Sequence, residues 1–340
     1  MRVLQLVHGF PPHSIAGSEI HTYQLAKALV RKGHKVHVIY PIYVKENKEN
    51  LRIKVVNETY KGIEIHKLII PLSRRERLKR ILYHENRYIY PRLEEPFKKL
   101  LKEIEPDIIH IQHLINLSIT FTDIIWDEGI PYIITLHDYW FLCPQTIMLD
   151  YKGNPCHNLS PLKCRDCWCI QHAQNLAAYC SQKLRTPRTI LYEVFYYILR
   201  TLNSTSTFAR RYNYMMKVLK QADLLIAPSK FLRDMFWKYG IPRKRIIHLP
   251  NGYDSSVFKN FRKIRSYKTD GKIIFGYIGS ILYHKGVHIL VEAFTKIKSP
   301  KIILEIYGKY NPQSKYFKYI KNKISRSRNI ILKGPFKDIK

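Results

Sequence analysis

The chain has 340 residues, 46% of them hydrophobic, which is enough for a buried core in each of about two globular domains. No apolar run approaches the roughly 20 residues that span a bilayer, and residues 1–7 lack the basic flank and cleavage site of a secretory signal. Lys and Arg number 58 against 26 acidic residues, a formal net charge of +32, which favours phosphate-bearing partners or reflects a generally cation-rich proteome.

Short β-rich runs alternate with helical stretches over the first 250 residues, which is typical of a parallel α/β sheet. We expect a first strand at 3–7, then a loop, a helix at 20–32 and a stop at Gly33. A Cys-rich loop follows over 143–180, and a long helical region over 184–220. The remaining elements of this half are strands at 36–40, 108–111, 132–136, 224–227 and 246–249, and helices at 91–103, 117–128 and 231–239.

The α/β rhythm stops at the Asn251–Gly252 turn signal and restarts after a polar, basic segment. We therefore predict a first domain over 1–253, a linker over 254–271 and a partial second domain over 272–340. In the second domain we expect strands at 273–278, 302–307 and 330–332 and helices at 287–297 and 316–325. Because three parallel strands cover their faces poorly, we expect this domain to be truncated or completed by something else.

The loop over 8–18 places Gly17 and Ser18 where a helix begins. Unpaired backbone N–H groups and the helix dipole favour an anion there, so this is a candidate phosphate site. The alternative is an ordinary turn with Ser18 as N-cap. The loop has neither the dinucleotide-binding nor the P-loop glycine spacing, which excludes the two commonest nucleotide folds.

Two further positions carry candidate chemistry. His137 and Asp138 follow a strand directly, where parallel sheets gather functional groups, and a His there can move a proton or bind a sugar hydroxyl. Gly279 ends the first strand of the second domain, and Lys285–Gly286 opens the next helix, which combines a cation with free N–H donors suited to a diphosphate. A structural histidine and a surface lysine are the alternatives.

All six cysteines lie between Cys143 and Cys180. Clustering favours a local site over a disulfide framework spread along the chain. The C-x-x-C spacing of Cys164 and Cys167 is typical of half a zinc site, which Cys143 and Cys156 would complete as a structural site. Cys169 is an alternative ligand, and free buried thiols, disulfides or another metal remain open.

The segment 183–220 is rich in arginine and aromatic residues. Its cations could meet anionic lipid while its aromatic side chains insert at the interface. The alternative is a helix packed through its aromatics with a solvated basic face. The residues in question are Arg185, Arg188, Arg200, Arg210 and Arg211, with Tyr192, Phe195, Tyr196 and Ile198.

Five ordered motifs together resemble family 4 glycosyltransferases, and they spread over nearly the whole chain. The first two are Phe10-Pro-Pro…Gly17-Ser-Glu19, with Gly33-His-Lys-Val36 after it, and Leu136-His-Asp-Tyr-Trp-Phe-Leu-Cys-Pro144. The others are Ala227-Pro-Ser229 with Gly240-Ile-Pro242, Leu249-Pro-Asn-Gly-Tyr-Asp254 with Phe258, and Gly276-Tyr-Ile-Gly279…Lys285-Gly286 with Ala293-Phe294. The cysteine pattern also resembles a subset of this family, in which it would be a local structural staple.

The resemblance implies a GT-B fold, with an acceptor-side and a donor-side Rossmann-like domain, and sugar transfer with retention and without a catalytic metal. It implies that His137 contacts the sugar or acceptor and that Lys285 holds the donor diphosphate. A fixed cation is chemically suited to that role, because without a metal the leaving group needs another source of positive charge. By matching position, donor or acceptor contacts are expected at Gly17, Ser18, Glu19, Asp138, Asn251, Gly279, Ser280 and Gly286.

The sequence departs from the family pattern twice. Ser280 and the two residues after it replace an arginine that many relatives carry after the glycine at 279, and the paired donor-binding glutamates of the family do not occur before Lys340. We therefore carry three hypotheses: an enzyme moving sugar to a saccharide or lipid-linked saccharide in cell-envelope polysaccharide or glycoconjugate synthesis, an incomplete subunit that needs a partner, and a basic nucleic-acid-binding protein. Nucleic acid is the least favoured partner, because no recognition motif is present. We expect a cytoplasmic protein, peripheral at the inner face of the membrane if its basic charge meets anionic lipid.

Overall fold

The computed structural model describes residues 1–48, 51–184, 186–254 and 271–335. The chain forms two compact units, the first comprising Met1–Tyr151 and Pro155–Asp254 and the second Lys152–Asn154 and Ser255–Lys340. Most of the predicted linker, over 255–270, lies outside the described residues.

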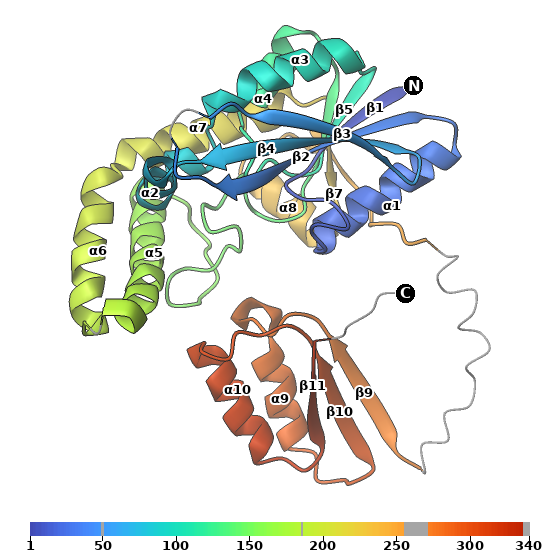
Figure 1. Ribbon diagram of the computed structural model, residues 1–340. Helices are drawn as coiled ribbons and strands as arrows, with labels where there is room; N and C mark the ends of the chain where they lie inside the picture. The colour runs from blue at the N-terminus through green and yellow to red at the C-terminus, as the bar shows by residue number, and fades with distance from the viewer. Residues whose placement is uncertain (49–50, 185, 255–270, 336–340) are drawn as a thin grey trace. The chain divides into compact units, whose positions relative to one another are not determined.

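The first unit contains an eight-stranded sheet in the order β3-β4-β2-β1-β5-β6-β7-β8 (Figure 1). All neighbouring strands are parallel except β3, which pairs antiparallel with β4. This confirms the expected parallel α/β architecture. The strands are β1 (Arg2–Leu6), β2 (Lys35–Lys45), β3 (Lys54–Tyr60), β4 (Ile63–Leu72), β5 (Ile108–Ile111), β6 (Tyr132–Thr135), β7 (Leu224–Ala227) and β8 (Ile246–His248).

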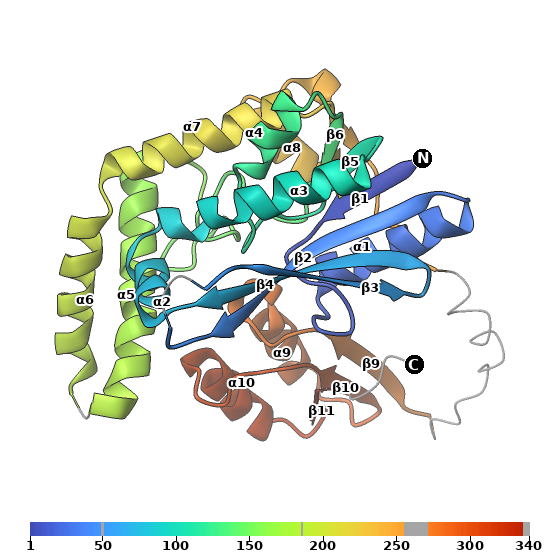
Figure 2. The same cartoon turned by 45° about the horizontal axis from the view of Figure 1, so that its top comes forward.

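Helices cover the two faces of this sheet unequally. Helices α3 and α4 lie on one side of the sheet and α1 on the other (Figure 2). The α-helices of the first unit are α1 (Gly17–Arg31), α2 (Arg74–Leu82), α3 (Glu94–Ile104), α4 (Phe121–Asp127), α5 (Pro161–Leu184), α6 (Arg188–Leu202), α7 (Thr205–Gln221) and α8 (Lys230–Lys238). Three short 3-10 turns, η1 (Glu85–Arg87), η2 (Pro91–Leu93) and η3 (Arg243–Arg245), precede α3 and β8.

The alternation of strand side chains divides the core into two layers. Leu4 and Leu6 of β1 belong to the large cluster that contains Phe97 of α3, whereas Val36 and Val38 of β2 belong to a smaller cluster beside α1. Successive residues of a strand point to opposite faces, so continuously apolar strands are required when both faces are buried. This explains why the strand runs are mainly apolar, with a few buried polar residues such as Gln5 and His110.

The β3–β4 hairpin was not predicted. Its two strands are joined at Lys61 and Gly62, both with positive φ. Two-residue turns of this backbone type match the twist of the strands they connect, and a glycine favours them. The segment was missed because its first strand is mostly polar and exposed on the sheet edge.

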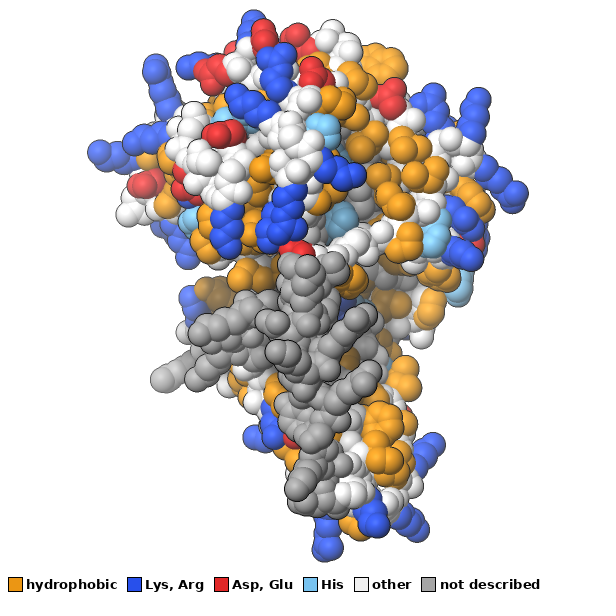
Figure 3. Space-filling model, turned by 90° about the vertical axis from the view of Figure 1, so that its right-hand side faces the viewer, with side chains coloured by type: hydrophobic (Ala, Val, Ile, Leu, Met, Phe, Trp, Pro, Cys, Tyr) orange, Lys and Arg blue, Asp and Glu red, His pale blue; other side chains and the backbone are white. Residues whose placement is uncertain are grey.

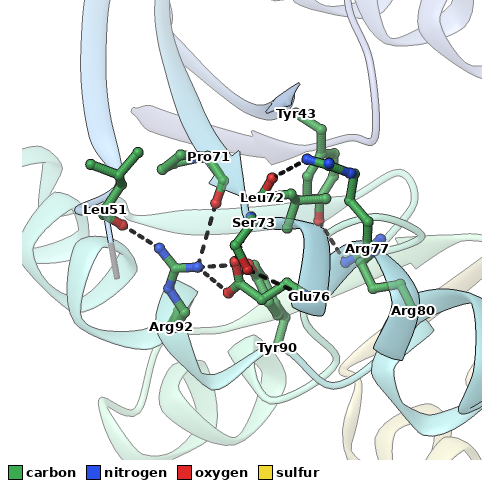
Figure 4. A network of polar contacts seen from close by, with 10 residues as sticks. All are labelled: Tyr43, Leu51, Pro71, Leu72, Ser73, Glu76, Arg77, Arg80, Tyr90 and Arg92. Atoms are coloured by element: carbon green, nitrogen blue, oxygen red, sulfur yellow. Dashed lines mark hydrogen bonds and ion pairs between the residues drawn. The ribbon is translucent and has the colours of Figure 1, made fainter. Parts of the chain in front are cut away.

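A polar network joins the end of β4 to α2 (Figure 4). Ser73 and Glu76 form a capping box, in which the Glu76 N–H donates to Ser73 Oγ at 3.2 Å and the Ser73 N–H donates to Glu76 Oε2 at 3.0 Å. Arg92 donates to the same Glu76 carboxylate, and Arg77 donates to the carbonyl oxygen of Leu72 at 2.6 Å. Reciprocal capping satisfies helix-end groups that would otherwise lack partners, so this corner fixes how α2 leaves the sheet.

The expected Cys-rich loop over 143–180 is wrong in its second half, where residues from Pro161 onward form α5. This stretch has no Gly or Pro after its first residue, and Trp168, Ala173 and Ala177 give it a buried face. The loop was predicted because the cysteines were read as a local site, and the helical pattern was overlooked.

The long helical region expected over 184–220 is confirmed, and it consists of two helices, α6 and α7. Asn203 separates α6 from α7, and Ser204 caps α7 by accepting from the Thr207 N–H at 3.3 Å. Asn and Ser compete with the helix for backbone partners, which favours a break at this point. Helix α4 is likewise shorter than the predicted 117–128.

The second unit contains the three-stranded parallel sheet β11-β10-β9. Within the described residues β9 pairs on one side only, and its Ile273, Phe275 and Ile278 side chains are exposed. Its core lies between the sheet and two helices. The elements are β9 (Ile273–Ile278), η6 (Tyr283–Lys285), α9 (Val287–Thr295), β10 (Ile302–Tyr307), α10 (Lys315–Ser325) and β11 (Ile330–Gly334).

Candidate active site

A cavity of about 600 Å³ lies in the first unit, beside the carboxyl ends of β1, β5 and β6. It is lined mainly by polar side chains, as expected for the crevice at this edge of an open parallel sheet. Of the residues predicted for the site, the structure brings five together in its lining: Gly17, Ser18, His137, Asp138 and Asn251.

Three histidines of this lining occupy equivalent positions on neighbouring strands. His8, His113 and His137 are each the second residue beyond the end of β1, β5 and β6. The rings of His8 and His113 meet edge to face, with centroids 4.8 Å apart. The rule that selected His137 applies equally to His8 and His113, so the sequence contained the signal that would have found them.

His137 is held through one ring nitrogen. Its Nε2 lies 2.9 Å from Oε1 of Gln112, the residue just past the end of β5. With the Gln112 carbonyl as acceptor, Nε2 carries the proton and Nδ1 is left as an acceptor. Burial first, and then the neighbouring His21 and His113, lower the pKa of His137 to about 3. The ring is therefore neutral at pH 7 and suited to accept a hydrogen bond from a sugar hydroxyl.

Asp138 orients His113 and the chain that follows. The backbone N–H of Ile115 donates to Nδ1 of His113 at 2.9 Å, so Nε2 of that ring donates to Asp138 Oδ2 at 3.2 Å. The other Asp138 oxygen accepts from the Trp140 N–H at 2.7 Å. Burial alone would raise the pKa of Asp138, but these contacts with His113 and Trp140 outweigh it and lower the pKa. Asp138 is thus an ionised positioning group.

Glu19 lies beneath the pocket and is almost completely buried. Its Oε1 lies 3.3 Å from His8 Nε2 and accepts from Ser14 Oγ at 2.8 Å, while its Oε2 accepts from Ser18 Oγ at 3.0 Å. Burial would raise its pKa, but the partners His8 and Ser14 outweigh burial and lower the pKa to about 2. Glu19 therefore positions His8 and the start of α1 instead of lining the cavity.

The start of α1 faces the cavity without a side-chain cap. The N-cap residue is Ala16, so the alternative in which Ser18 caps the helix is wrong. A Cβ built on Gly17 would meet no heavy atom within 4 Å, so the backbone here is open to close approach. Free N–H groups at an open helix start remain suited to an anion.

Other members of the lining escaped the sequence reasoning. His21 and Gln24 lie on the first turns of α1, and His21 packs edge to face against His137 with centroids 5.2 Å apart. Thr146 and Tyr253 come from loops after β6 and β8. Their places depend on loop paths that no local pattern specifies.

An apolar cavity of about 440 Å³ adjoins the polar one on the α1 face of the sheet. Leu25 and Leu29 of α1 and Ile108 and Ile133 of the strands contribute to its walls. His21, Asn251 and Gly252 line both cavities. This face of the sheet is therefore only partly covered by helices in the described part of the chain.

The predicted donor residues lie in the second unit, between β9 and α9. Gly279 directly follows β9, and its N–H donates to the Tyr307 carbonyl at 2.9 Å. Gly308 packs so closely that a Cβ on it would come within 1.8 Å of the Gly279 carbonyl oxygen. Lys285 is exposed, and Gly286, at φ 69°, begins α9. No carboxylate of the described residues forms an ion pair with Lys285, so its charge is open to a ligand.

Four cysteines also come together. Cys143, Cys156, Cys164 and Cys167 line one cavity of about 20 Å³, whereas Cys169 packs in a separate core. Burial first, and then the proximity of Cys143 and Cys156, raise the pKa of the Cys164 thiol to about 12. In the described ranges no group of three or more His, Cys, Asp or Glu side chains is arranged as a ready metal-coordination shell.

The arginine- and aromatic-rich segment is buried in part, mainly in α7, whereas α6 is mostly exposed. Arg211 is 2% exposed, donates to the Trp140 carbonyl and packs beside Tyr88, so its assignment to a lipid-facing surface is wrong. Tyr192 and Tyr196 stack on each other against the core of the α5–α7 region. Arg185 is outside the described residues.

Two further observations bear on the partners considered from sequence. None of the described helices has the length and apolar character needed to cross a bilayer. Lys and Arg side chains are spread over the visible face instead of forming one stripe (Figure 3).

Solved structures share the fold of this chain. One similar structure is Anabaena HepE in complex with UDP, with a TM-score of 0.53 and 14% identity, covering 100% of this chain and 70% of that one. Sucrose-phosphate synthase from Thermosynechococcus elongatus has a TM-score of 0.53 and 15% identity over 98% of this chain and 70% of that one. A UDP-forming trehalose-phosphate synthase from Burkholderia xenovorans has a TM-score of 0.55 and 10% identity over 100% and 75%. These similarities show that the chain has the GT-B fold.

The family itself follows from the sequence models. The model of Glycosyltransferase Family 4 matches residues 15–257, and that of Glycosyl transferases group 1 matches 258–338. The chain therefore belongs to glycosyltransferase family 4, with a group 1 segment after it. A curated relative, an uncharacterized 42.6 kDa protein in the cps region of Klebsiella pneumoniae, is 27% identical over 139 residues. That match spans 39% of this chain and about a third (35%) of the Klebsiella protein.

Proposed function

We propose that this protein transfers a sugar from a nucleotide-sugar donor to a saccharide or lipid-linked saccharide, with retention of anomeric configuration and without a catalytic metal. Membership of the family supports the transferase class. The observation that carries the proposal furthest is the polar cavity, in which five residues predicted from sequence lie together with three further histidines.

The first unit would bind the acceptor and the transferred sugar. A neutral His137 with Nδ1 as acceptor is suited to orient a hydroxyl, and Asp138 keeps His113 in the tautomer whose Nε2–H faces it. Because Gln112 and Asp138 hold these rings before substrate arrives, little ordering cost remains on binding. The open backbone at Gly17 would admit a phosphate or a sugar against the start of α1.

The second unit would bind the donor diphosphate. Lys285 is exposed and unpaired within the described ranges, and the start of α9 directly follows it. A fixed cation beside free N–H groups stabilises the negative charge that develops on a departing nucleotide, which is the task a metal performs elsewhere. The Anabaena structure contains UDP, which makes uridine donors the first to test.

The pathway that we propose is polysaccharide or glycoconjugate synthesis. The Klebsiella relative is encoded in a cps region, which supports a role in polysaccharide or glycoconjugate synthesis. A peripheral position on an anionic membrane would place the enzyme beside lipid-linked acceptors, with the exposed Arg188 and Arg200 of α6 as candidate contacts.

A donor screen tests the proposal. The 340-residue chain and any longer product of the same reading frame would be titrated with UDP-, GDP- and ADP-sugars, with binding measured by calorimetry and hydrolysis by nucleotide release. We expect one nucleotide class to bind and turn over, with EDTA leaving the rate unchanged. The anomeric configuration of the product, read by NMR, tests retention. No binding of any nucleotide sugar by either product would overturn the proposal.

A further inference from the structure

A tight cavity outside the polar pocket collects cysteines from three separate segments. Cys143 lies in the turns after β6, Cys156 ends a short hairpin closed by the Leu149–Pro155 bridge, and Cys164 and Cys167 lie on the first turns of α5. A cavity of about 20 Å³ has room for about one water-sized particle. Any ligand there is therefore a single ion and not an organic molecule.

Backbone donors point at the sulfur atoms. The Gln145 N–H donates to Cys143 Sγ at 3.4 Å, and the Met148 N–H is directed at the same sulfur. The Tyr151 N–H is directed at Cys167. Hydrogen bonds of this kind favour sulfur that carries negative charge, and they are the usual outer shell of metal-bound thiolates.

A buried cation lies beside the cluster. Arg211 is 2% exposed, and it lines a small cavity together with Cys164. It donates to the neutral carbonyl of Trp140, and no carboxylate of the described residues forms an ion pair with it. Burying an unpaired guanidinium is costly, so this position favours an anionic neighbour, and the cysteine cluster is the neighbour that can become one.

We propose that Cys143, Cys156, Cys164 and Cys167 bind one structural zinc ion as four thiolates, with Arg211 as the counter-cation. Residues 164 and 167 are three apart on a helix and share a face, as a C-x-x-C half-site requires. Because the sulfur atoms are not already arranged as a coordination shell, binding requires their side chains to rotate inward until each lies about 2.3 Å from the metal.

Nearby cations compensate part of the charge of such a site. Four thiols release four protons to solvent on binding, so four thiolates and Zn²⁺ carry a net charge of −2. Lys163 and Asp150, which both line the cavity, offset each other, and Arg211 lines the adjacent cavity with Cys164. The buried guanidinium of Arg211 and the anionic metal centre would therefore stabilise each other.

The ion would connect the polar pocket to α5. The Thr146 N–H donates to the Cys143 carbonyl at 2.9 Å, and Thr146 lines the polar cavity. A bond from Cys143 through zinc to Cys164 and Cys167 would therefore fix one wall of the active site to a helix 20 residues further on. The site is structural, since all four positions are taken by protein ligands.

Metal analysis of the purified chain tests the site directly. We expect about one zinc per chain by elemental mass spectrometry, released when a mercurial reagent blocks the thiols. Replacing zinc with Co²⁺ should give thiolate charge-transfer absorption and the intense visible bands of a tetrahedral site. Absence of bound zinc, with failure of added Zn²⁺ or Co²⁺ to bind, would overturn the proposal, as would a disulfide between any of the four cysteines in the reduced cytosolic preparation.

Variants separate the four ligands from the other cysteines. Cys164→Ser and Cys167→Ser should each lower the zinc content to well below half, whereas the matched control Cys180→Ser, half-buried on the same helix, should retain it. Arg211→Met should weaken zinc affinity by about 10–100-fold, as loss of an outer-shell partner usually does. Equal zinc in Cys164→Ser and Cys180→Ser would contradict the assignment. If the serine variants do not fold, the cobalt spectrum of the unmodified chain decides the question.

Discussion

The polar pocket of the first unit and the Lys285 loop of the second represent opposite ways to build a binding site. In the pocket, His8, His113 and His137 are held by Glu19, Asp138 and Gln112, so their orientations are set by the protein. In the loop, Lys285 is exposed, and no ion pair holds it in the described part of the chain. We therefore expect substitutions in the pocket to change stability and function together, and substitutions at Lys285 to change function alone.

The strongest test of this contrast is Lys285→Ala. We expect sugar transfer to fall about 10²–10³-fold, the usual cost of removing a preorganised stabiliser of developing charge. The free energy of unfolding should change by less than about 0.5 kcal/mol, because the side chain is on the surface. Steady-state kinetics and urea unfolding give both quantities. Lys298→Ala, also exposed in the second unit, is the matched control, and an equal rate for the two variants would refute the role of Lys285.

A smaller loss is expected for His137→Ala. Removing one hydrogen bond to substrate should lower kcat/KM about 10–100-fold, and the loss of the Gln112 contact should lower stability by about 1 kcal/mol. His137→Asn should recover part of both. The exposed His157→Ala serves as control, measured by the same kinetics and unfolding. Unchanged kcat/KM in His137→Ala would show that the pocket binds something other than the reacting sugar.

The buried histidines of the first unit predict a pH dependence of its stability. Burial lowers the pKa of His110 to about 3, below its ordinary value of 6.5. The neutral ring thus contributes stability that is fully present above pH 6.5 and is lost as pH falls toward 3. Between pH 7 and pH 5 we expect this one residue to lower the free energy of unfolding by about 2 kcal/mol. Urea unfolding at several pH values measures the slope, and His110→Gln should reduce it; an unaltered slope would contradict the assignment.

The smallest effect expected is that of Ser73→Ala at the β4–α2 corner. Loss of the N-cap should cost about 1 kcal/mol of stability. Transfer kinetics should not change, because none of the pocket-lining residues belongs to this corner. Thermal unfolding and kinetics check the two halves of the statement. A kinetic defect in Ser73→Ala equal to that of His137→Ala would mean that the β4–α2 corner contributes to the pocket as well as to stability.

The sequence predicted the parallel sheets because buried parallel strands are apolar runs separated by amphipathic helices. It did not predict β3, whose polar residues lie on an exposed edge, or α5, whose cysteines suggested a loop. Propensity and periodicity are local, whereas an edge strand is specified by its partner. Tertiary pairing therefore accounts for the missed β3, whereas the helical pattern of α5 was present in the sequence and its cysteines led to the prediction of a loop.

The candidate site was predictable to a similar degree. His137 and Asp138 were found because they follow a strand, and the same position after β1 and β5 identifies His8 and His113, since β1, β5 and β6 are consecutive in the sheet. Thr146 and Tyr253 could not be found in this way, since long-range loop packing brings them to the pocket. The role of Glu19 as a support beneath the lining also needed the structure, because the motif alone does not distinguish a ligand contact from a partner of His8.

The close approach of Gly308 to Gly279 gives position 308 an influence over a residue it does not touch. A methyl group there would collide with the Gly279 carbonyl oxygen and force the ends of β9 and β10 apart. Lys285 lies six residues after Gly279 on the segment that follows β9, so a displacement of Gly279 would also move Lys285. Glycine at 308 therefore allows the two backbones to lie in contact. A larger residue there would shift the backbone of the Lys285 loop without changing any side chain of that loop.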